Sequence, residues 1–189
     1  MVTAAPQELQ PDRDPADRLA SVEAAAATNL DMAELGRRII QAAYLEGDFV
    51  LRSGRRSTYY FDKYLFATDP SILRDLGVAL AARIPTDTDR VAGPELGAVA
   101  LATVAALATG IPSVLVRKAA KDYGTGKRIE GVLRAGDRVI LIEDVMTTGG
   151  QALDSAEALR DAGTEVTRVI AIVDREEGGA EALHTAGFD

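Results

Sequence analysis

The segment Val139-Ile140-Leu141-Ile142-Glu143-Asp144-Val145-Met146-Thr147-Thr148-Gly149-Gly150 decides the fold of this chain. Its first four residues are apolar and mostly β-branched, which predicts a buried strand. Two carboxylates and a turn of hydroxyls and glycines follow, and a helical pattern then runs from Gln151 to Ala162. A strand, a turn and a helix N-terminus in this order form an anion site, because free backbone N–H groups and the helix dipole converge on the turn.

The residue types in this segment favour one class of ligand. The hydroxyls of Thr147 and Thr148 add donors, and the two glycines after them let the backbone close around a tetrahedral phosphate. Glu143 and Asp144 would repel a phosphate, but they can accept hydrogen bonds from a vicinal diol. The sequence therefore predicts a site for a ribose 5-phosphate. The alternative is an ordinary strand–helix unit whose acidic pair is solvated.

Composition limits the classes of protein to consider. A length of 189 residues, 47% of them hydrophobic, suits one domain with a large core. No apolar run approaches the roughly 20 residues that cross a bilayer, and no signal peptide is visible, so we expect a cytoplasmic protein without a membrane partner. The chain has no cysteine and a single histidine, His184, which excludes disulfides, thiolate or histidine-rich metal sites and Ser-His or Cys-His hydrolases.

Charge is unevenly distributed along the chain. The formal net charge of -8 argues against a nucleic-acid partner, because phosphate backbones would be repelled. The stretch from Arg117 to Arg128 nevertheless holds five cations and only one acid, Asp122. Because salt screens surface charges beyond about 8–10 Å, such a local group can still attract a phosphorylated small molecule. Its alternative interpretation is a solvated loop.

The pattern of elements predicts an α/β fold with a doubly wound, mainly parallel sheet. Residues 1–29 read as a disordered leader, 31–65 as a small N-terminal unit with a helix and two short strands, and 66–189 as a core of alternating strands and helices. In such a sheet, ligands bind at the carboxyl ends of the strands. By the alternation, a closing strand would be expected after the last helix, and the chain stops there.

Four segments in the same order resemble orotate phosphoribosyltransferase, a family of type I phosphoribosyltransferases that bind phosphoribosyl pyrophosphate (PRPP). The first is the acidic strand end and turn quoted above. Val116–Gly131 is similar to the catalytic loop of that family, Phe49–Asp62 to the N-terminal hood over the pyrimidine, and Val173–Arg175 to a strand end that contacts orotate. The resemblance covers residues 31–189. It implies transfer of the 5-phosphoribosyl group from PRPP to orotate, with Mg²⁺ carried by PRPP, no direct protein ligand to the metal, and a homodimer that shares the loop between subunits.

Site residues follow from the resemblance, position by position. Lys121 matches the catalytic loop lysine, and Asp144 joins it as the catalytic carboxylate. The implied PRPP contacts are Arg117, Lys118, Lys121, Tyr123, Glu143, Asp144, Val145, Met146, Thr147, Thr148, Gly149, Gly150 and Gln151. The implied orotate contacts are Arg52, Tyr60, Phe61, Thr147 and Arg175.

Some residues depart from the family pattern or allow a second interpretation. Tyr123 stands where the family commonly has histidine, and Leu96-Gly97 replaces a Tyr-Lys pair, so that one lysine contact is missing. Arg175 could instead pair with Glu176 or Glu177 on the surface, and the arginines of the hood turn could simply be solvated. One of Tyr59 and Tyr60 is expected in the core, and Asp62 and Lys63 are expected on the surface.

Two other functions remain open from the residues alone. The chain could transfer the phosphoribosyl group to a purine base, although the hood hairpin and Arg175 favour orotate. It could also be a PRPP-sensing regulator that lost activity, although the acidic leader offers no basic face for a nucleic acid.

Overall fold

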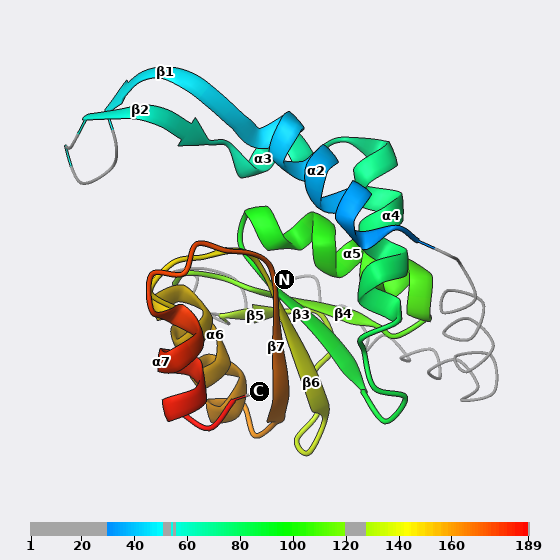
Figure 1. Cartoon of the computed structure of the whole chain (residues 1–189). Helices are drawn as coiled ribbons and strands as arrows, with labels where there is room; N and C mark the ends of the chain where they lie inside the picture. The colour runs from blue at the N-terminus through cyan, green and yellow to red at the C-terminus, as the bar shows by residue number, and fades with distance from the viewer. Residues whose placement is uncertain (1–29, 51–53, 55, 120–127, 189) are drawn as a thin grey trace, which may run out of the picture.

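The computed structural model describes residues 30–50, 54, 56–119 and 128–188. Their elements are α2 (Met32–Ala43), β1 (Tyr44–Val50), β2 (Arg56–Phe61), α3 (Lys63–Ala67), α4 (Pro70–Ala81), β3 (Arg90–Pro94), α5 (Gly97–Thr109), β4 (Ser113–Val116), β5 (Ile129–Glu130), β6 (Arg138–Met146), α6 (Gly150–Asp161), β7 (Glu165–Asp174) and α7 (Gly179–Thr185). Figure 1 shows the sheet between two groups of helices, with the β1–β2 hairpin extending away from it.

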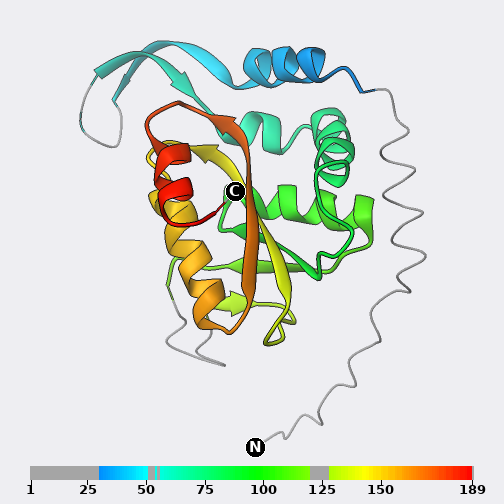
Figure 2. The same ribbon diagram turned by 60° about the horizontal axis from the view of Figure 1, so that its bottom comes forward.

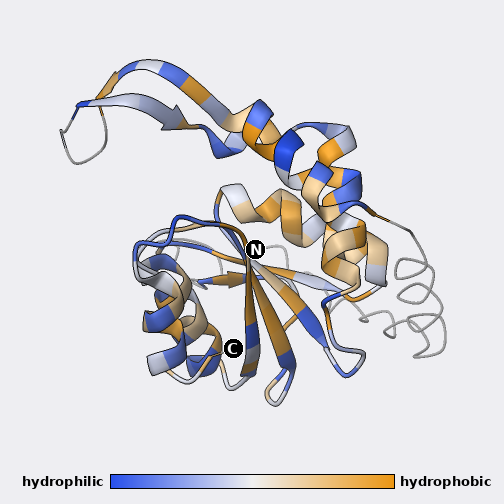
Figure 3. Cartoon of the chain, in the orientation of Figure 1, coloured by the Kyte–Doolittle hydropathy of each residue, from blue (hydrophilic) through white to orange (hydrophobic). Residues whose placement is uncertain are grey.

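The main sheet has the strand order β5-β4-β3-β6-β7, and only the short edge strand β5 runs antiparallel. Alternate residues of its central strands enter two separate cores. Val91, Ile140 and Ile142 pack with α2 to α5 on one face, while Val139 and Leu141 pack with α6 and α7 on the other. Figure 2 shows the two groups of helices on either side of the sheet, and Figure 3 shows a long hydrophobic stretch along β6. The predicted doubly wound α/β fold is confirmed.

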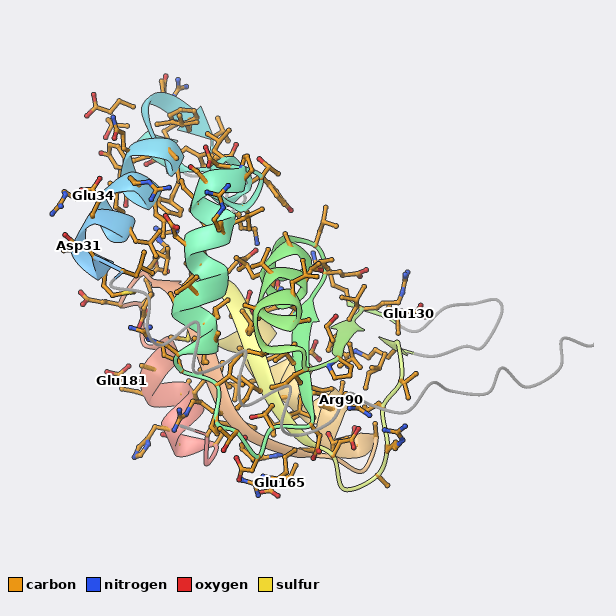
Figure 4. All side chains as sticks on the ribbon, turned by 90° about the vertical axis from the view of Figure 1, so that its right-hand side faces the viewer. Asp31, Glu34, Arg90, Glu130, Glu165 and Glu181 are labelled. Atoms are coloured by element: carbon orange, nitrogen blue, oxygen red, sulfur yellow. The ribbon has the colours of Figure 1, made fainter. Side chains whose placement is uncertain are left out.

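The starts of the parallel strands lie at the edge of the sheet remote from the hairpin. Arg90 begins β3 and Glu165 begins β7, and Figure 4 labels both near the bottom of the view, opposite the hood. Arg90 is only 1% exposed, and its Nε lies 3.2 Å from a carboxylate oxygen of Asp137 and 2.9 Å from the Val132 carbonyl. The carboxyl ends of β3 and β6 therefore lie at the other edge, toward α3 and the hairpin.

The hood differs from the sequence-based expectation in two ways. A short helix, α3, follows the hairpin, because Asp62 caps it by accepting a hydrogen bond from the Tyr64 N–H while Phe66 is completely buried. The prediction that one of Tyr59 and Tyr60 is core is wrong: they are 41% and 42% exposed. A two-stranded ribbon has no covered face of its own, so its aromatic rings pack on each other instead, as Tyr59 does on Tyr44 at 5.5 Å.

Among the described residues, no helix combines the length and apolar character that a membrane crossing requires. The leader, residues 1–29, lies outside the described residues.

Candidate active site

The turn after β6 forms a small pocket at the carboxyl edge of the sheet. Gly149 caps α6 with a φ of +79°, a left-handed conformation that suits glycine. A Cβ on Gly149 would lie 3.0 Å from the carbonyl oxygen of Gly179, so the start of α7 closes the turn from outside. The resulting cavity has a volume of about 120 Å³ and is lined by Glu143, Val145, Met146, Thr147, Thr148, Gly149, Gly150, Gln151 and Ala152.

The acidic pair differs from the solvated pair that an ordinary strand–helix unit would have. β6 continues to Met146, farther than the predicted apolar run, so both carboxylates stand on the buried strand, 3% exposed at Glu143 and 1% at Asp144. Burial, together with the hydrogen bond and negative charge of Asp144, raises the pKa of Glu143 to about 8. Among the described residues, the buried Glu143 Oε2 has no hydrogen-bond partner, so this acceptor is unsatisfied.

Lys63 makes the ion pair that the sequence did not predict. Its Nζ lies 2.7 Å from Asp144 Oδ2 and its side chain is 31% exposed, so Lys63 is a partly exposed residue paired with a buried carboxylate, whereas a solvated surface residue was expected. The cause is the α3 turn, which directs the first helical side chain toward the sheet. The other Asp144 oxygen, Oδ1, accepts a hydrogen bond of 2.6 Å from the Val145 N–H. A Cβ at Gly97 would lie 1.6 Å from Asp144 Oδ2, so the ion pair between Lys63 and Asp144 requires glycine at position 97. This glycine is the sequence signal that could have indicated the ion pair.

The basic segment begins beside the turn after β3. The Lys118 N–H donates to Glu95 Oε1 at 2.7 Å, and the buried Arg117 Nε has no hydrogen-bond partner within the part of the chain that the structure describes. Arg128, at the far end of the segment, donates to the Arg117 carbonyl at 3.0 Å and pairs with Asp154 of α6. Residues Lys121 and Tyr123, expected to contact pyrophosphate, lie outside the described residues.

The residues expected to contact orotate are more dispersed. Phe61 is half-buried against Phe66, whereas Tyr60 is exposed and tilts against Phe49. Arg175 forms the surface ion pair that was its alternative interpretation, with 3.0 Å between its Nη2 and Glu177 Oε1. Arg52 lies outside the described residues.

Two other residues of the acidic segment face inward. Met146 is buried and packs with α6 and α7, and Val145 packs partly against the opposite core. The Met146 carbonyl accepts a hydrogen bond of 3.0 Å from the Arg175 N–H, which joins the end of β7 to the end of β6. Within the described residues, no three His, Cys, Asp or Glu side chains gather closely enough to hold a metal ion.

Known proteins agree with this architecture. No family model matches the chain. Orotate phosphoribosyltransferase of Methanocella arvoryzae is 51% identical over 141 residues, 75% of this chain and 81% of that protein. The Pyrococcus furiosus enzyme is 45% identical over 82% of this chain and 87% of its own length.

Solved structures point the same way. Orotate phosphoribosyltransferase of Mycobacterium tuberculosis H37Rv, solved with Fe(III) dicitrate, aligns with a TM-score of 0.73 and 35% identity over 82% of this chain and 91% of that one. The same enzyme solved with PRPP aligns at a TM-score of 0.69 and 33% identity, over 82% of this chain and 90% of that one. Adenine phosphoribosyltransferase of Saccharomyces cerevisiae, at 20% identity and a TM-score of 0.64 over 79% of this chain and 94% of that one, shows the fold alone. The predicted family and enzyme class are confirmed: the chain belongs to the orotate phosphoribosyltransferases, glycosyltransferases that transfer pentosyl groups.

Proposed function

We propose that the chain transfers the 5-phosphoribosyl group of PRPP to orotate at the pocket after β6, giving orotidine 5'-monophosphate and pyrophosphate for pyrimidine synthesis. The observation that carries this assignment is the buried acidic pair directly beside a hydroxyl- and glycine-rich turn at a helix N-terminus. That combination suits a phosphate and a vicinal diol in adjacent places, and PRPP has both.

Each part of PRPP has a counterpart in the site. The 5-phosphate would bind at the Thr147–Gly150 turn. The ribose diol would donate hydrogen bonds to Asp144 and to Glu143 Oε2, which has no hydrogen-bond partner among the described residues. The pyrophosphate would lie toward the turn after β3, near the residues that begin and continue the basic segment: Arg117, Lys118, Lys121 and Tyr123.

Orotate would bind between the hood and the end of β7. Tyr60 and Phe61 close β2 above the site, Thr147 lies on the turn, and Arg175 has a fork of donors suited to a carboxylate. For this contact Arg175 must leave Glu177. Because that ion pair is exposed, we expect the exchange to cost less than about 1 kcal/mol.

Electrostatic stabilisation would supply the rate enhancement. The bond from ribose C1 to the pyrophosphate oxygen breaks as the bond from C1 to orotate nitrogen forms, and positive charge develops on the ribose ring. Asp144 is 1% exposed and its Oδ1 accepts a hydrogen bond from the Val145 N–H, so the backbone of β6 holds the carboxylate in place to face this charge. We assign to Lys121 the neutralisation of the departing pyrophosphate.

The same proposal includes Mg²⁺, a homodimer and a cytoplasmic location. When bound, Mg²⁺ would neutralise charge on the pyrophosphate. Mg²⁺ usually keeps several waters and is held mainly by substrate phosphates, so we assign it to PRPP and give it no direct protein ligand. In the dimer, the catalytic loop would reach the neighbouring site. The hood (residues 31–65) and the core (residues 66–189) would together form one phosphoribosyltransferase domain.

The test is an absorbance assay that follows loss of orotate with PRPP and Mg²⁺. We expect turnover with orotate and none with adenine, guanine or hypoxanthine in its place. Titration calorimetry with PRPP and Mg²⁺, on protein shown to be folded by circular dichroism, provides an independent reading. Absence of both binding heat and turnover would refute the assignment.

A further inference from the structure

We propose that Lys63 is a displaceable counter-ion of Asp144: its ammonium leaves the carboxylate when the ribose diol binds and contacts the pyrophosphate of PRPP instead. This assignment rests on the function proposed above, and it gives the described part of the chain a substrate contact outside the segments expected to hold one.

The first support is the accessibility of the two partners. The Asp144 side chain is 1% exposed, whereas that of Lys63 is 31% exposed. Oδ1 of Asp144 is occupied by the Val145 N–H and Oδ2 by the ammonium. Because Asp144 is buried and the Lys63 ammonium is in contact with its Oδ2, movement of Lys63 would open this oxygen to a diol, and the partly exposed, four-carbon lysine stem is the part of the pair that can move.

The second support is the space kept clear for the lysine. Gly97 begins α5, and a Cβ there would lie 1.6 Å from Asp144 Oδ2 and 3.2 Å from Lys63 Cε. The stem of Lys63 thus passes over the first residue of α5, where a side chain would otherwise stand. The N-terminal cap residue, Leu96, makes no side-chain hydrogen bond to the helix. The Lys63 stem therefore lies beside the N-terminal end of α5, where the helix dipole also favours an anion.

The third support is the anchoring of the segment that carries Lys63. Asp62 donates its N–H to the Ala43 carbonyl at 2.8 Å and caps α3 through its carboxylate, and Phe66 and Ala67 are buried. The backbone at Lys63 is therefore fixed, and only its side chain has freedom to exchange partners. When the diol binds Asp144, the displaced Lys63 ammonium forms an ion pair with the pyrophosphate. The lysine charge therefore remains paired after the exchange.

The experiment compares two ligands that differ in the pyrophosphate. PRPP carries the diol, the 5-phosphate and the pyrophosphate, whereas ribose 5-phosphate lacks the last of these. In wild type, ribose 5-phosphate must displace Lys63 without offering it a new partner. Lys63→Met should therefore weaken PRPP binding roughly 10- to 100-fold, the range for a hydrogen bond between charged groups, while ribose 5-phosphate binds as well as before or several-fold tighter.

Dissociation constants are measured with Mg²⁺ for PRPP by calorimetry and for ribose 5-phosphate by competition against PRPP. Lys63→Arg should keep most of the PRPP affinity. Arg74→Met, which removes a cation from the exposed face of α4, is the matched control and should change neither constant. Circular dichroism and thermal unfolding establish that each variant is folded.

The possible results of these binding measurements distinguish the displacement of Lys63 from the proposed function. Equal weakening of both ligands by Lys63→Met would mean that Lys63 only organises Asp144, and it would overturn the displacement. Unchanged PRPP binding would overturn it as well. Failure of the wild-type protein to bind PRPP would instead refute the proposed function, and the role of Lys63 with it.

Discussion

Replacement of Glu143 by glutamine should make the protein more stable above neutral pH, by an amount that depends on pH. The folded protein raises the pKa of Glu143 from an ordinary value of 4.5 to about 8, chiefly through burial. The folded state therefore binds more protons than the unfolded state between these two values, and stability falls as pH rises through the window. The glutamine side chain of the variant cannot titrate and resembles the protonated acid. The free energy of unfolding of the variant therefore does not fall through this titration.

The magnitude follows from the width of the window. From 4.5 to about 8 the window is about 3.5 pH units wide, and about 1.4 kcal/mol per unit gives a ceiling of about 5 kcal/mol. Relaxation of the site and water entry reduce this ceiling, and we expect a gain of about 2–4 kcal/mol. The stability difference between Glu143→Gln and wild type should be small at pH 5, should grow steadily to pH 8 and should level off above it.

Urea unfolding followed by circular dichroism at half-unit pH steps from 5 to 9 measures this difference. Titrating groups remote from Glu143 are common to both proteins, so subtraction removes them and leaves the titration of Glu143 with its neighbours Asp144 and Lys63. Glu157→Gln on the exposed face of α6 is the matched control and should give a nearly flat difference. A flat profile for Glu143→Gln, within about 0.5 kcal/mol, would refute the buried protonated acid and the diol site argued from it.

Three further changes test other parts of the molecule. Lys121→Ala should lower kcat about 10²- to 10³-fold in the orotate assay while urea unfolding stays unchanged; near-full turnover would remove Lys121 from the mechanism. Gly97→Ala should weaken PRPP binding at least tenfold in calorimetry, because the new methyl group overlaps Asp144 Oδ2; wild-type affinity would show that the carboxylate is not fixed there. Phe66→Ala should cost about 3–5 kcal/mol in urea unfolding, since the ring is completely buried beneath the hood, and a loss below about 1 kcal/mol would contradict that packing.

Local patterns predicted the elements well because each has a local cause. Asp31 accepts hydrogen bonds from the N–H groups of Ala33 and Glu34, the usual role of an aspartate that begins a helix. Gly110 ends α5 with a φ of +73°, a left-handed conformation in which glycine commonly ends helices. The turn at Gly149 was predicted for the same reason, since glycine there permits a conformation that other residues disfavour.

Contacts between distant segments could not be predicted in this way. Lys63 follows a polar strand end and looks like a solvated residue until α3 turns it toward β6. Tyr59 alternates with Tyr60 as in a half-buried strand, yet the hairpin has no sheet behind it to bury either ring. Arg175 was assigned to orotate from the resemblance, whereas its guanidinium pairs with the nearby Glu177 on the surface.

The order of the strands explains why the candidate site lies between β3 and β6. From β3 the chain passes through α5, on one face of the sheet, to β4 on one side; from β6 it passes through α6, on the opposite face, to β7 on the other side. The two helices therefore begin on either side of a crevice at the carboxyl ends of neighbouring strands, the position where open α/β sheets bind ligands. Gly97 starts one helix and Gly150 the other, and Asp144 lies on the strand next to both turns. The N-terminal ends of α5 and α6 carry partial positive charge and lie on either side of the Asp144 carboxylate. A ligand with a phosphate at each end and hydroxyls between them would match this arrangement. An acidic protein can consequently bind a polyanion, because the helix ends and Lys63 act over a few ångströms while the net charge of -8 is screened by salt.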